Sequence, residues 1–377
     1  YIGGLFSDVG GVARSNLARV LADNTVSPWD PSANNVVRAL LLAGGTVYIG
    51  GDFTTIAGLG RNRIAAVNPA TGVPAAWNPN ANNTVRAIAL NGSDVLAGGN
   101  FTNIGGQARN RIASLSATTG LATGWNPNAN SNVFALSIVG STVYAGGQFT
   151  NIGGLARNRI AALNAASGTA TAWNPNANNN VNALAAGAGT VYAGGQFTSV
   201  GGQTRNRVAA LDATTGLATG WNPNASTTVQ SIVLRGATLY AGGDFLSIGG
   251  QSRSRVAAIA VATGLATSWD PTAYGTVSVV AVDGPDVFVG GLFNAVGGVR
   301  RDNLAAFDVT TGQPTAWNPD ANNAVLALSL KHGVVYAGGS FTLMGGQIRN
   351  SVAALDTTLG IASGWNPGTN GSVSALA

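Results

Sequence analysis

The chain has 377 residues, a formal net charge of +5 and 9% charged residues, against roughly a quarter in ordinary soluble domains. The composition has no cysteine, no glutamate, one lysine and one histidine, which excludes disulfides and Cys-ligated metals and removes most general acid–base catalysts. The 54 glycines and 13 prolines exclude long helices. The sequence contains no run of 18 apolar residues, the length that would be needed to span a bilayer. Its positive charges are scattered along the chain, which argues against a nucleic-acid partner.

The sequence consists of eight repeats with a period of 48 residues. Tryptophan occurs once in each repeat: Trp29, Trp77, Trp125, Trp173, Trp221, Trp269, Trp317 and Trp365. The phenylalanine of a G-G-x-F motif recurs in the same way: Phe6, Phe53, Phe101, Phe149, Phe197, Phe245, Phe293 and Phe341. A fixed period of this length is typical of solenoids and propellers.

One repeat divides into four short apolar runs with turn residues between them. The predicted order is strand 181–185, turn 187–189, strand 190–194, long loop 195–205, strand 208–212, turn 214–216, strand 217–221 and connection 222–228. Four strands in each of eight repeats predict an all-β, eight-bladed β-propeller with four antiparallel strands per blade.

The two ends of the chain carry complementary parts of one repeat. Residues 373–377 match the first strand of a repeat and residues 1–4 match the second. We therefore expect residues 1–30 and 373–377 to form the closing blade of a single domain, 1–377, which hides two sheet edges; an open solenoid is the alternative. Because the chain begins at Tyr1 within a strand pattern, we expect it to be a mature or excised piece of a longer protein.

Two motifs carry a family resemblance over the whole chain. The segment A-L-D-A-T-T-G-L-A-T-G-W, residues 210–221, preceded by V-Y-A-G-G, residues 191–195, resembles the quinoprotein-type propeller repeat. That resemblance implies a tryptophan that docks between neighbouring blades. The stretch G-G-x-F-T-x-x-G-G-x-x-R-N-x-x-A also resembles repeats of large secreted or surface-attached bacterial proteins and of a fungal cortical polarity marker.

The quinone chemistry of that family is not expected here. Quinoprotein dehydrogenases of this shape hold their quinone with a vicinal cysteine pair and with Ca²⁺ ligated partly by glutamate, and the chain has neither residue type. We therefore expect no cofactor.

Two arginine columns are the most suggestive polar pattern. The first contains Arg14, Arg61, Arg109, Arg157, Arg205, Arg253, Arg301 and Arg349. Its strict recurrence favours a structural donor to loop carbonyls, with a ring of guanidinium groups for carboxylates, sulfates or acidic sugars as the alternative. The second column, replaced by Asn16, Asn303 and Ser351 in the other three repeats, is a candidate ligand-facing set: Arg63, Arg111, Arg159, Arg207 and Arg255.

The asparagine-rich N-P-N-A-N-N loops are expected on the same face as the arginine loops, because consecutive strands of a meander alternate in direction. Asn82, Asn130 and Asn178 are candidate ligand-facing residues there, although asparagine is also a common turn former. The variable position of G-G-x-F is either solvent-exposed or ligand-facing. We expect no metal site, because these loops mostly lack carboxylates and the one imidazole, His332, is expected to be exposed.

These patterns predict a non-enzymatic, extracellular interaction or structural module, such as an adhesion or scaffold propeller, within a larger surface or secreted protein. Its partner is expected to be a protein or a glycan on the Asn/Arg-rich face. The alternative is a multivalent carbohydrate-binding lectin with repeated sites on that face. An Asp-based hydrolase is disfavoured because no acid is both unique and paired. A third column contains the aromatic residues Tyr1, Tyr48, Tyr144, Tyr192, Tyr240, Phe288 and Tyr336, so only Phe134, Tyr274 and Phe307 lie outside the three aromatic columns, and rings that could stack on sugars are scarce.

Overall fold

The computed structural model describes residues 1–21, 26–187, 189–331 and 333–376. His332 and Ala377, the last residue of the predicted closing strand, lie outside these ranges. Every element within them is a β-strand, which confirms the all-β prediction. No helix among the described residues is long and apolar enough to cross a membrane. The chain divides into two compact units: unit 1 comprises Tyr1–Ser27, Asn206–Val208 and Trp221–Ala377, and unit 2 comprises Pro28–Arg205 and Ala209–Gly220.

Each repeat builds a small antiparallel sheet in which the second strand lies between the first and the third. The first strands are β5 (Val37–Ala43), β10 (Val85–Asn91), β15 (Val133–Val139), β20 (Val181–Gly187), β25 (Val229–Arg235), β30 (Ala273–Asp283), β34 (Val325–Lys331) and β39 (Val373–Leu376). The second strands are β1 (Ile2–Gly4), β6 (Thr46–Gly51), β11 (Asp94–Gly99), β16 (Thr142–Gly147), β21 (Thr190–Gly195), β26 (Thr238–Gly243), β31 (Asp286–Val296) and β35 (Val334–Gly339). The third strands are β4 (Leu17–Ala18), β9 (Ile64–Val67), β14 (Ile112–Ser116), β19 (Ile160–Asn164), β24 (Val208–Asp212), β29 (Val256–Ala260), β33 (Leu304–Asp308) and β38 (Val352–Asp356).

The predicted long loop between the second and third strands contains a short hairpin that the sequence pattern did not reveal. Its strand pairs are β2–β3 (Asp8–Val9, Val12–Ala13), β7–β8 (Thr55–Ile56, Leu59–Gly60), β12–β13 (Asn103–Ile104, Gln107–Ala108), β17–β18 (Asn151–Ile152, Leu155–Ala156), β22–β23 (Ser199–Val200, Gln203–Thr204), β27–β28 (Ser247–Ile248, Gln251–Ser252) and β36–β37 (Leu343–Met344, Gln347–Ile348). In the remaining repeat, β32 (Val299–Arg300) pairs with the end of the long strand β31.

The predicted fourth strand is reduced to a single bridge, so the repeat sheets have three strands, except that β32 adds a fourth strand to the sheet of β30, β31 and β33. Leu211 bridges Ala218 where a strand over 217–221 was expected. The short hairpin covers the outer edge of the segment 217–221: the Gly201 carbonyl between β22 and β23 accepts a hydrogen bond from the Ala218 N–H at 2.9 Å. A covered edge cannot template pairing with another chain.

A β-bulge interrupts the first strand near its start. In β15 the register against β16 shifts between Val133 and Ala135, so that Phe134 is the extra residue. The same shift occurs between Val37 and Ala39 in β5 and in the corresponding strands of other repeats. Bulges re-aim side chains and are often found beside functional sites.

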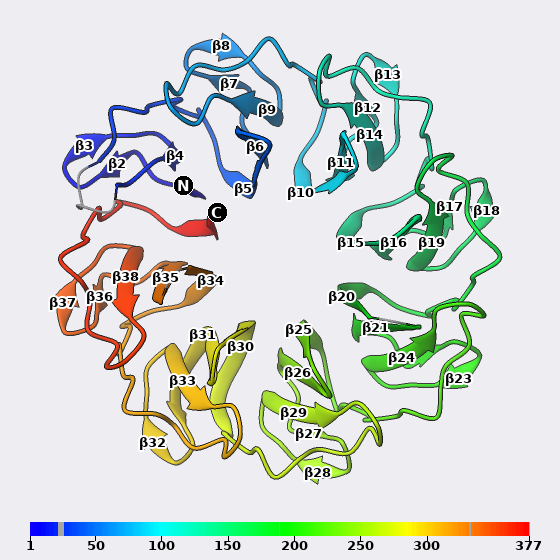
Figure 1. Ribbon diagram of the computed structural model, residues 1–377, viewed down its shortest axis with the longest axis vertical. Coiled ribbons are helices and arrows are strands. Elements are labelled where there is room, and N and C mark those ends of the chain that lie inside the picture. The colour runs from blue at the N-terminus through cyan, green and yellow to red at the C-terminus, as the bar shows by residue number, and fades with distance from the viewer. Residues whose placement is uncertain (22–25, 188, 332, 377) are drawn as a thin grey trace. The chain divides into compact units, whose positions relative to one another are not determined.

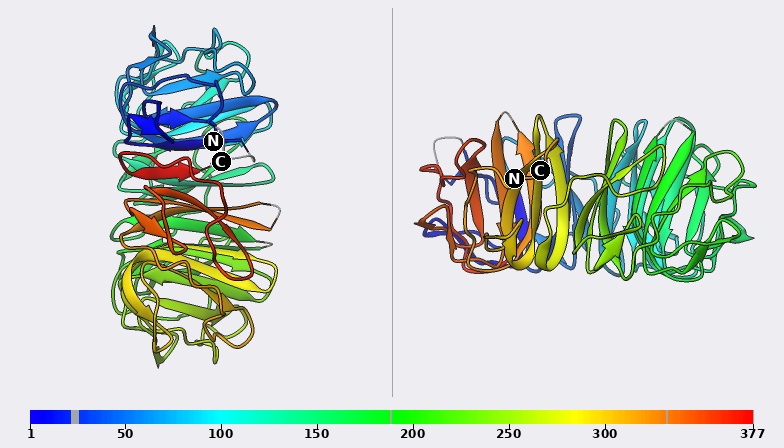
Figure 2. Two further views of the ribbon diagram at one scale, coloured as in Figure 1. Left: turned by 90° about the vertical axis from the view of Figure 1, so that its left-hand side faces the viewer. Right: turned by 90° about the horizontal axis from the view of Figure 1, so that it is seen from below.

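The two ends of the chain share one sheet inside unit 1. Strand β1 pairs with β39 on one side and with β4 on the other, and the ends marked N and C lie next to each other in Figure 2. Val373 of β39 is fully buried with Ile2 and Trp365. Strand 373–377, expected to complete the first sheet, is therefore found there over its described residues.

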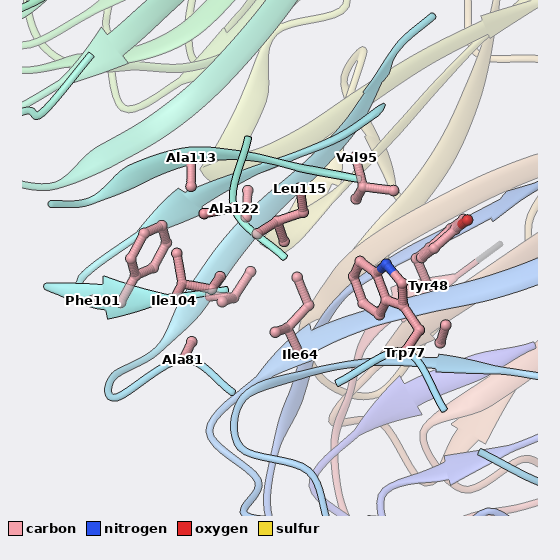
Figure 3. Close-up of a cluster of buried hydrophobic side chains, with 13 residues drawn as sticks. Tyr48, Ile64, Trp77, Ala81, Val95, Phe101, Ile104, Ala113, Leu115 and Ala122 are labelled. Carbon is pink, nitrogen blue, oxygen red and sulfur yellow. The ribbon is translucent and has the colours of Figure 1, made fainter. Parts of the chain in front are cut away.

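Successive sheets within each unit contact each other through their first strands. In unit 2, β10 lies beside β5 and β15, and β15 lies beside β20 (Figure 1). The repeat tryptophan fills the space between two such sheets: Trp77 is buried with Ile64, Val95 and Leu115 (Figure 3). Its Nε1 donates to the Ser116 carbonyl in the next repeat at 2.8 Å. The predicted docking of the tryptophan between neighbouring sheets is thus present.

Candidate functional site

Each arginine of the first column joins two backbone segments by donating hydrogen bonds to one carbonyl of each. Arg109 Nη1 donates to the carbonyl of Ala108 at 3.0 Å and Nη2 donates to that of Thr123 at 2.7 Å. The same fork recurs at the other seven members of the column, Arg14, Arg61, Arg157, Arg205, Arg253, Arg301 and Arg349. Burial lowers the pKa of Arg109. These guanidinium groups join the short hairpin to the fourth-strand segment, as the structural interpretation of the column predicted.

The second arginine column lies at a position of left-handed backbone. The φ angles of Arg63, Arg111, Arg159, Arg207 and Arg255 lie between 60° and 66°, and those of Asn16, Asn303 and Ser351 lie between 62° and 64°. The five arginines are half-buried. Arg255 Nη1 donates to the Ala273 carbonyl at 3.2 Å, and Arg111 and Arg207 each donate to the side-chain oxygen of the preceding asparagine. Their role as ligand-facing residues stays a prediction.

The candidate asparagines fasten one loop to another. Asn82 Oδ1 accepts hydrogen bonds from the backbone N–H groups of Thr102 and Asn103, and its Nδ2 donates to Thr102 Oγ1. We call this arrangement the asparagine latch; Asn130 and Asn178 make it as well. The latch joins the Asn-rich connection to the G-G-x-F-T loop, so the two loops lie on the same face, as expected. A ligand-facing role for these three side chains stays a prediction.

Three neighbouring first strands of unit 2 carry bulge residues next to variable G-G-x-F residues, and we call five of these residues the bulge row: Arg38, Asp52, Arg86, Asn100 and Phe134. Arg38 Nη2 lies 2.6 Å from Asp52 Oδ2, and Arg86 Nε donates to Asn100 Oδ1 at 2.9 Å. Partial burial by itself would raise the pKa of Asp52. Hydrogen bonds from Arg38 and Thr84 and the charges of Arg38 and Arg86 outweigh it and hold that pKa below its ordinary value.

Two cavities open in unit 1 at repeats that lack the second arginine. One, of about 450 Å³, is lined by Tyr274, Leu292, Phe293, Asn294, Arg300, Asp302, Asn303 and Asn322. The other, of about 370 Å³, is lined by Ser340, Thr342, Asn350, Ser351, Thr369, Asn370, Gly371 and Ser372. Sequence reasoning missed both. The available signal was that Asn303 and Ser351 replace an arginine and that Tyr274 replaces the latch asparagine.

The described residues contain no group of three or more histidine, cysteine, aspartate or glutamate side chains close enough together to hold a metal ion.

Comparisons with known proteins agree with this architecture. A family model described as outer membrane protein assembly factor BamB matches residues 140–360. No curated protein sequence matches the chain. The crystal structure of the computationally designed Ika8 protein has a TM-score of 0.65 at 16% identity, covering 93% of this chain and 92% of that one. The WD40 β-propeller domain of Doa1 has a TM-score of 0.53 at 9% identity, covering 89% and 94%. At these identities the two structures show likeness of fold alone, and that fold is propeller-like.

Proposed function

The chain belongs to the BamB-like quinoprotein repeat family, and from that premise we propose that it is a non-enzymatic interaction module built on a closed eight-bladed β-propeller. Eight repeats, each with its docking tryptophan, support the blade count. Pairing of β39 with β1 supports closure, because it places both ends of the chain in one sheet. In this proposal residues 1–377 form one domain.

The observation that carries the interaction role is that the repeated residues stabilise the fold, whereas residues that vary between repeats lie at the surface. The repeated Trp, Arg and Asn columns are engaged in holding the frame, through the tryptophan dock, the guanidinium fork and the asparagine latch. The bulge row contains residues that vary from repeat to repeat, and in it two arginines and a half-buried phenylalanine lie on neighbouring first strands. A rigid frame with a non-repeated surface is suited to recognising one partner.

The chemistry of the bulge row favours a partner with acidic groups. Arg38 and Arg86 lie on adjacent strands with a single carboxylate, Asp52, between them, so positive charge is in excess there. Arginine binds carboxylates and sulfates in a fork geometry. We place the module outside the cell, in a larger surface or secreted protein, on the resemblance of its G-G-x-F-T repeats to those of such proteins.

A multivalent lectin with repeated sites has weaker support. The side-chain oxygen and nitrogen atoms of Asn82, Asn130 and Asn178 already hydrogen-bond to their own loops, so they offer few free groups to sugar hydroxyls.

The test compares two double variants that each remove two positive charges. In Arg38→Ala/Arg86→Ala the charges leave the bulge row; in Arg235→Ala/Lys331→Ala they leave the opposite ends of first strands. Binding to immobilised heparin and to poly-glutamate is measured by surface plasmon resonance at low salt. We expect the bulge-row variant to bind about tenfold more weakly, equivalent to about 1.4 kcal/mol, and the control to bind like the native chain. Equal losses in both variants, or no binding by the native chain, would contradict the proposal.

A further inference from the structure

We propose that the cavity lined by Tyr274, Leu292, Asn294, Arg300 and Asp302 binds one pyranose ring of a neutral carbohydrate. The site is a single pocket in unit 1, distinct from the bulge row, and it extends the account beyond the proposed interaction role. It arises at the one place where three departures from the repeat coincide: a missing latch, a missing arginine and an added ion pair.

The missing latch exposes an aromatic ring. Tyr274 stands where other repeats have Asn34, Asn82, Asn130, Asn178, Ser226, Asn322 or Asn370. In place of a latch, β30 and β31 each lengthen to 11 residues and pair Ala273 with Val296 and Gly275 with Phe293. Gly275 permits this pairing with a φ of 138°, a backbone conformation that side chains disfavour. Tyr274 is left 58% exposed at the mouth of the cavity.

The missing arginine leaves room for a ligand. Arg255 Nη1 donates to the Ala273 carbonyl, and Asn303 Nδ2 donates to the Ala321 carbonyl 48 residues later, at 2.6 Å. The two side chains therefore satisfy the same backbone group, but asparagine is shorter. The cavity of about 450 Å³ beside Asn303 falls within the range of about 300–1,000 Å³ that small-molecule sites occupy.

The lining matches the two kinds of surface of a sugar ring. Tyr274 and Leu292, both 58% exposed, offer an aromatic and an aliphatic surface for its C–H groups. Arg300 binds Asp302 Oδ2 through both Nε, at 3.1 Å, and Nη2, at 2.8 Å. That geometry leaves other guanidinium donors and Oδ1 for hydroxyl groups. Asn294 adds an exposed amide.

The charge of the site favours a neutral ligand. Arg300 and Asp302 form an ion pair at 2.8 Å, with the Arg300 side chain 81% exposed, so their charges compensate each other. An acidic ligand would have to compete with Asp302 for the guanidinium group. A neutral polyol can accept from Arg300 and donate to Asp302 without breaking the pair.

The repeat itself supplies variants that should fold. Tyr274→Asn restores the asparagine that six other repeats have at this position. Asn303→Arg places arginine at a φ of 64°, within the range that five native arginines already adopt. Ser351→Arg makes the same kind of change in the second cavity and is the matched control.

Saturation-transfer-difference NMR with a panel of neutral methyl pyranosides, including methyl glucoside, galactoside, mannoside and N-acetylglucosaminide, provides the test, followed by calorimetry. We expect one or more members to bind with a stoichiometry of one, and Tyr274→Asn and Asn303→Arg each to weaken binding at least tenfold, while Ser351→Arg leaves it unchanged. Absence of binding across the panel, or binding that survives both substitutions, overturns the proposal. Several equivalent sites per chain would also overturn it, in favour of the repeated-site lectin. The heparin and poly-glutamate assay reports on the bulge row independently.

Discussion

Replacing Trp173 with alanine is expected to lower the free energy of unfolding by about 3–5 kcal/mol, as other large truncations of buried aromatic residues do. The indole is 2% exposed and lies edge-on to Tyr144 of β16, with the ring centroids 5.3 Å apart. Its Nε1 donates to the Asp212 carbonyl at 2.8 Å. Alanine would leave a cavity between two sheets and a carbonyl without its donor. Urea denaturation followed by far-UV circular dichroism measures the loss.

Trp173→Phe separates the contribution of ring packing from that of the hydrogen bond between the indole N–H and the Asp212 carbonyl. Phenylalanine keeps most of the ring but has no N–H, so we expect it to cost about 1–2 kcal/mol. If Trp173→Ala cost less than about 1 kcal/mol, the tryptophan would not be the packing residue that joins neighbouring sheets.

Replacing Gly147 with alanine is expected to cost about 3 kcal/mol, the upper part of the usual range for overpacking. A Cβ there would collide with the carbonyl oxygen of Asn132 and would lie 3.0 Å from the Val133 Cα. Both contacts are backbone atoms at the bulge of the first strand, so no side-chain rotation relieves them. The same measurement of unfolding by urea applies.

Gly124→Ala is the matched control for this change. A Cβ at Gly124 meets nothing within 4 Å, and other repeats have alanine at the same position, as in Ala172. We expect a neutral effect or a stabilisation of up to about 1 kcal/mol, because alanine restricts the unfolded chain. Equal destabilisation by the two substitutions would show that the bulge does not bring the two strands together as described.

The period of the sequence was sufficient to predict the repeated sheets. The tryptophan column, the G-G-x-F motif and the matching ends at residues 1–4 and 373–377 each imply packing or pairing that the structure contains. These features follow from local chemistry repeated eight times. Asn82 was harder to interpret, because an asparagine in a loop gives the same sequence signal whether it binds a ligand or latches a neighbouring backbone.

The short hairpins and the cavities could not be predicted from the pattern. Strands of two residues, such as Ser199–Val200, are too short to show alternation. The fourth strand was overestimated because the apolar run 217–221 packs against a sheet without pairing along its length. The cavity beside Asn303 depends on Tyr274 of β30 and Arg300 of β32 being brought together from two separate strands, which a single column of the repeat does not reveal.

Closure of the repeat array through its two ends is tested most directly by a cross-link between β1 and β39. Ile2 faces Leu376 in the register of that pair, and facing residues of antiparallel strands have Cα atoms about 4.5–5.5 Å apart, within disulfide range. The chain has no cysteine of its own, so Ile2→Cys/Leu376→Cys introduces the one possible disulfide. We predict that the oxidised variant forms a cyclised monomer whose altered gel mobility is reversed by reductant. Cross-linked dimers or oligomers, or two thiols that stay free under oxidising conditions, would contradict closure.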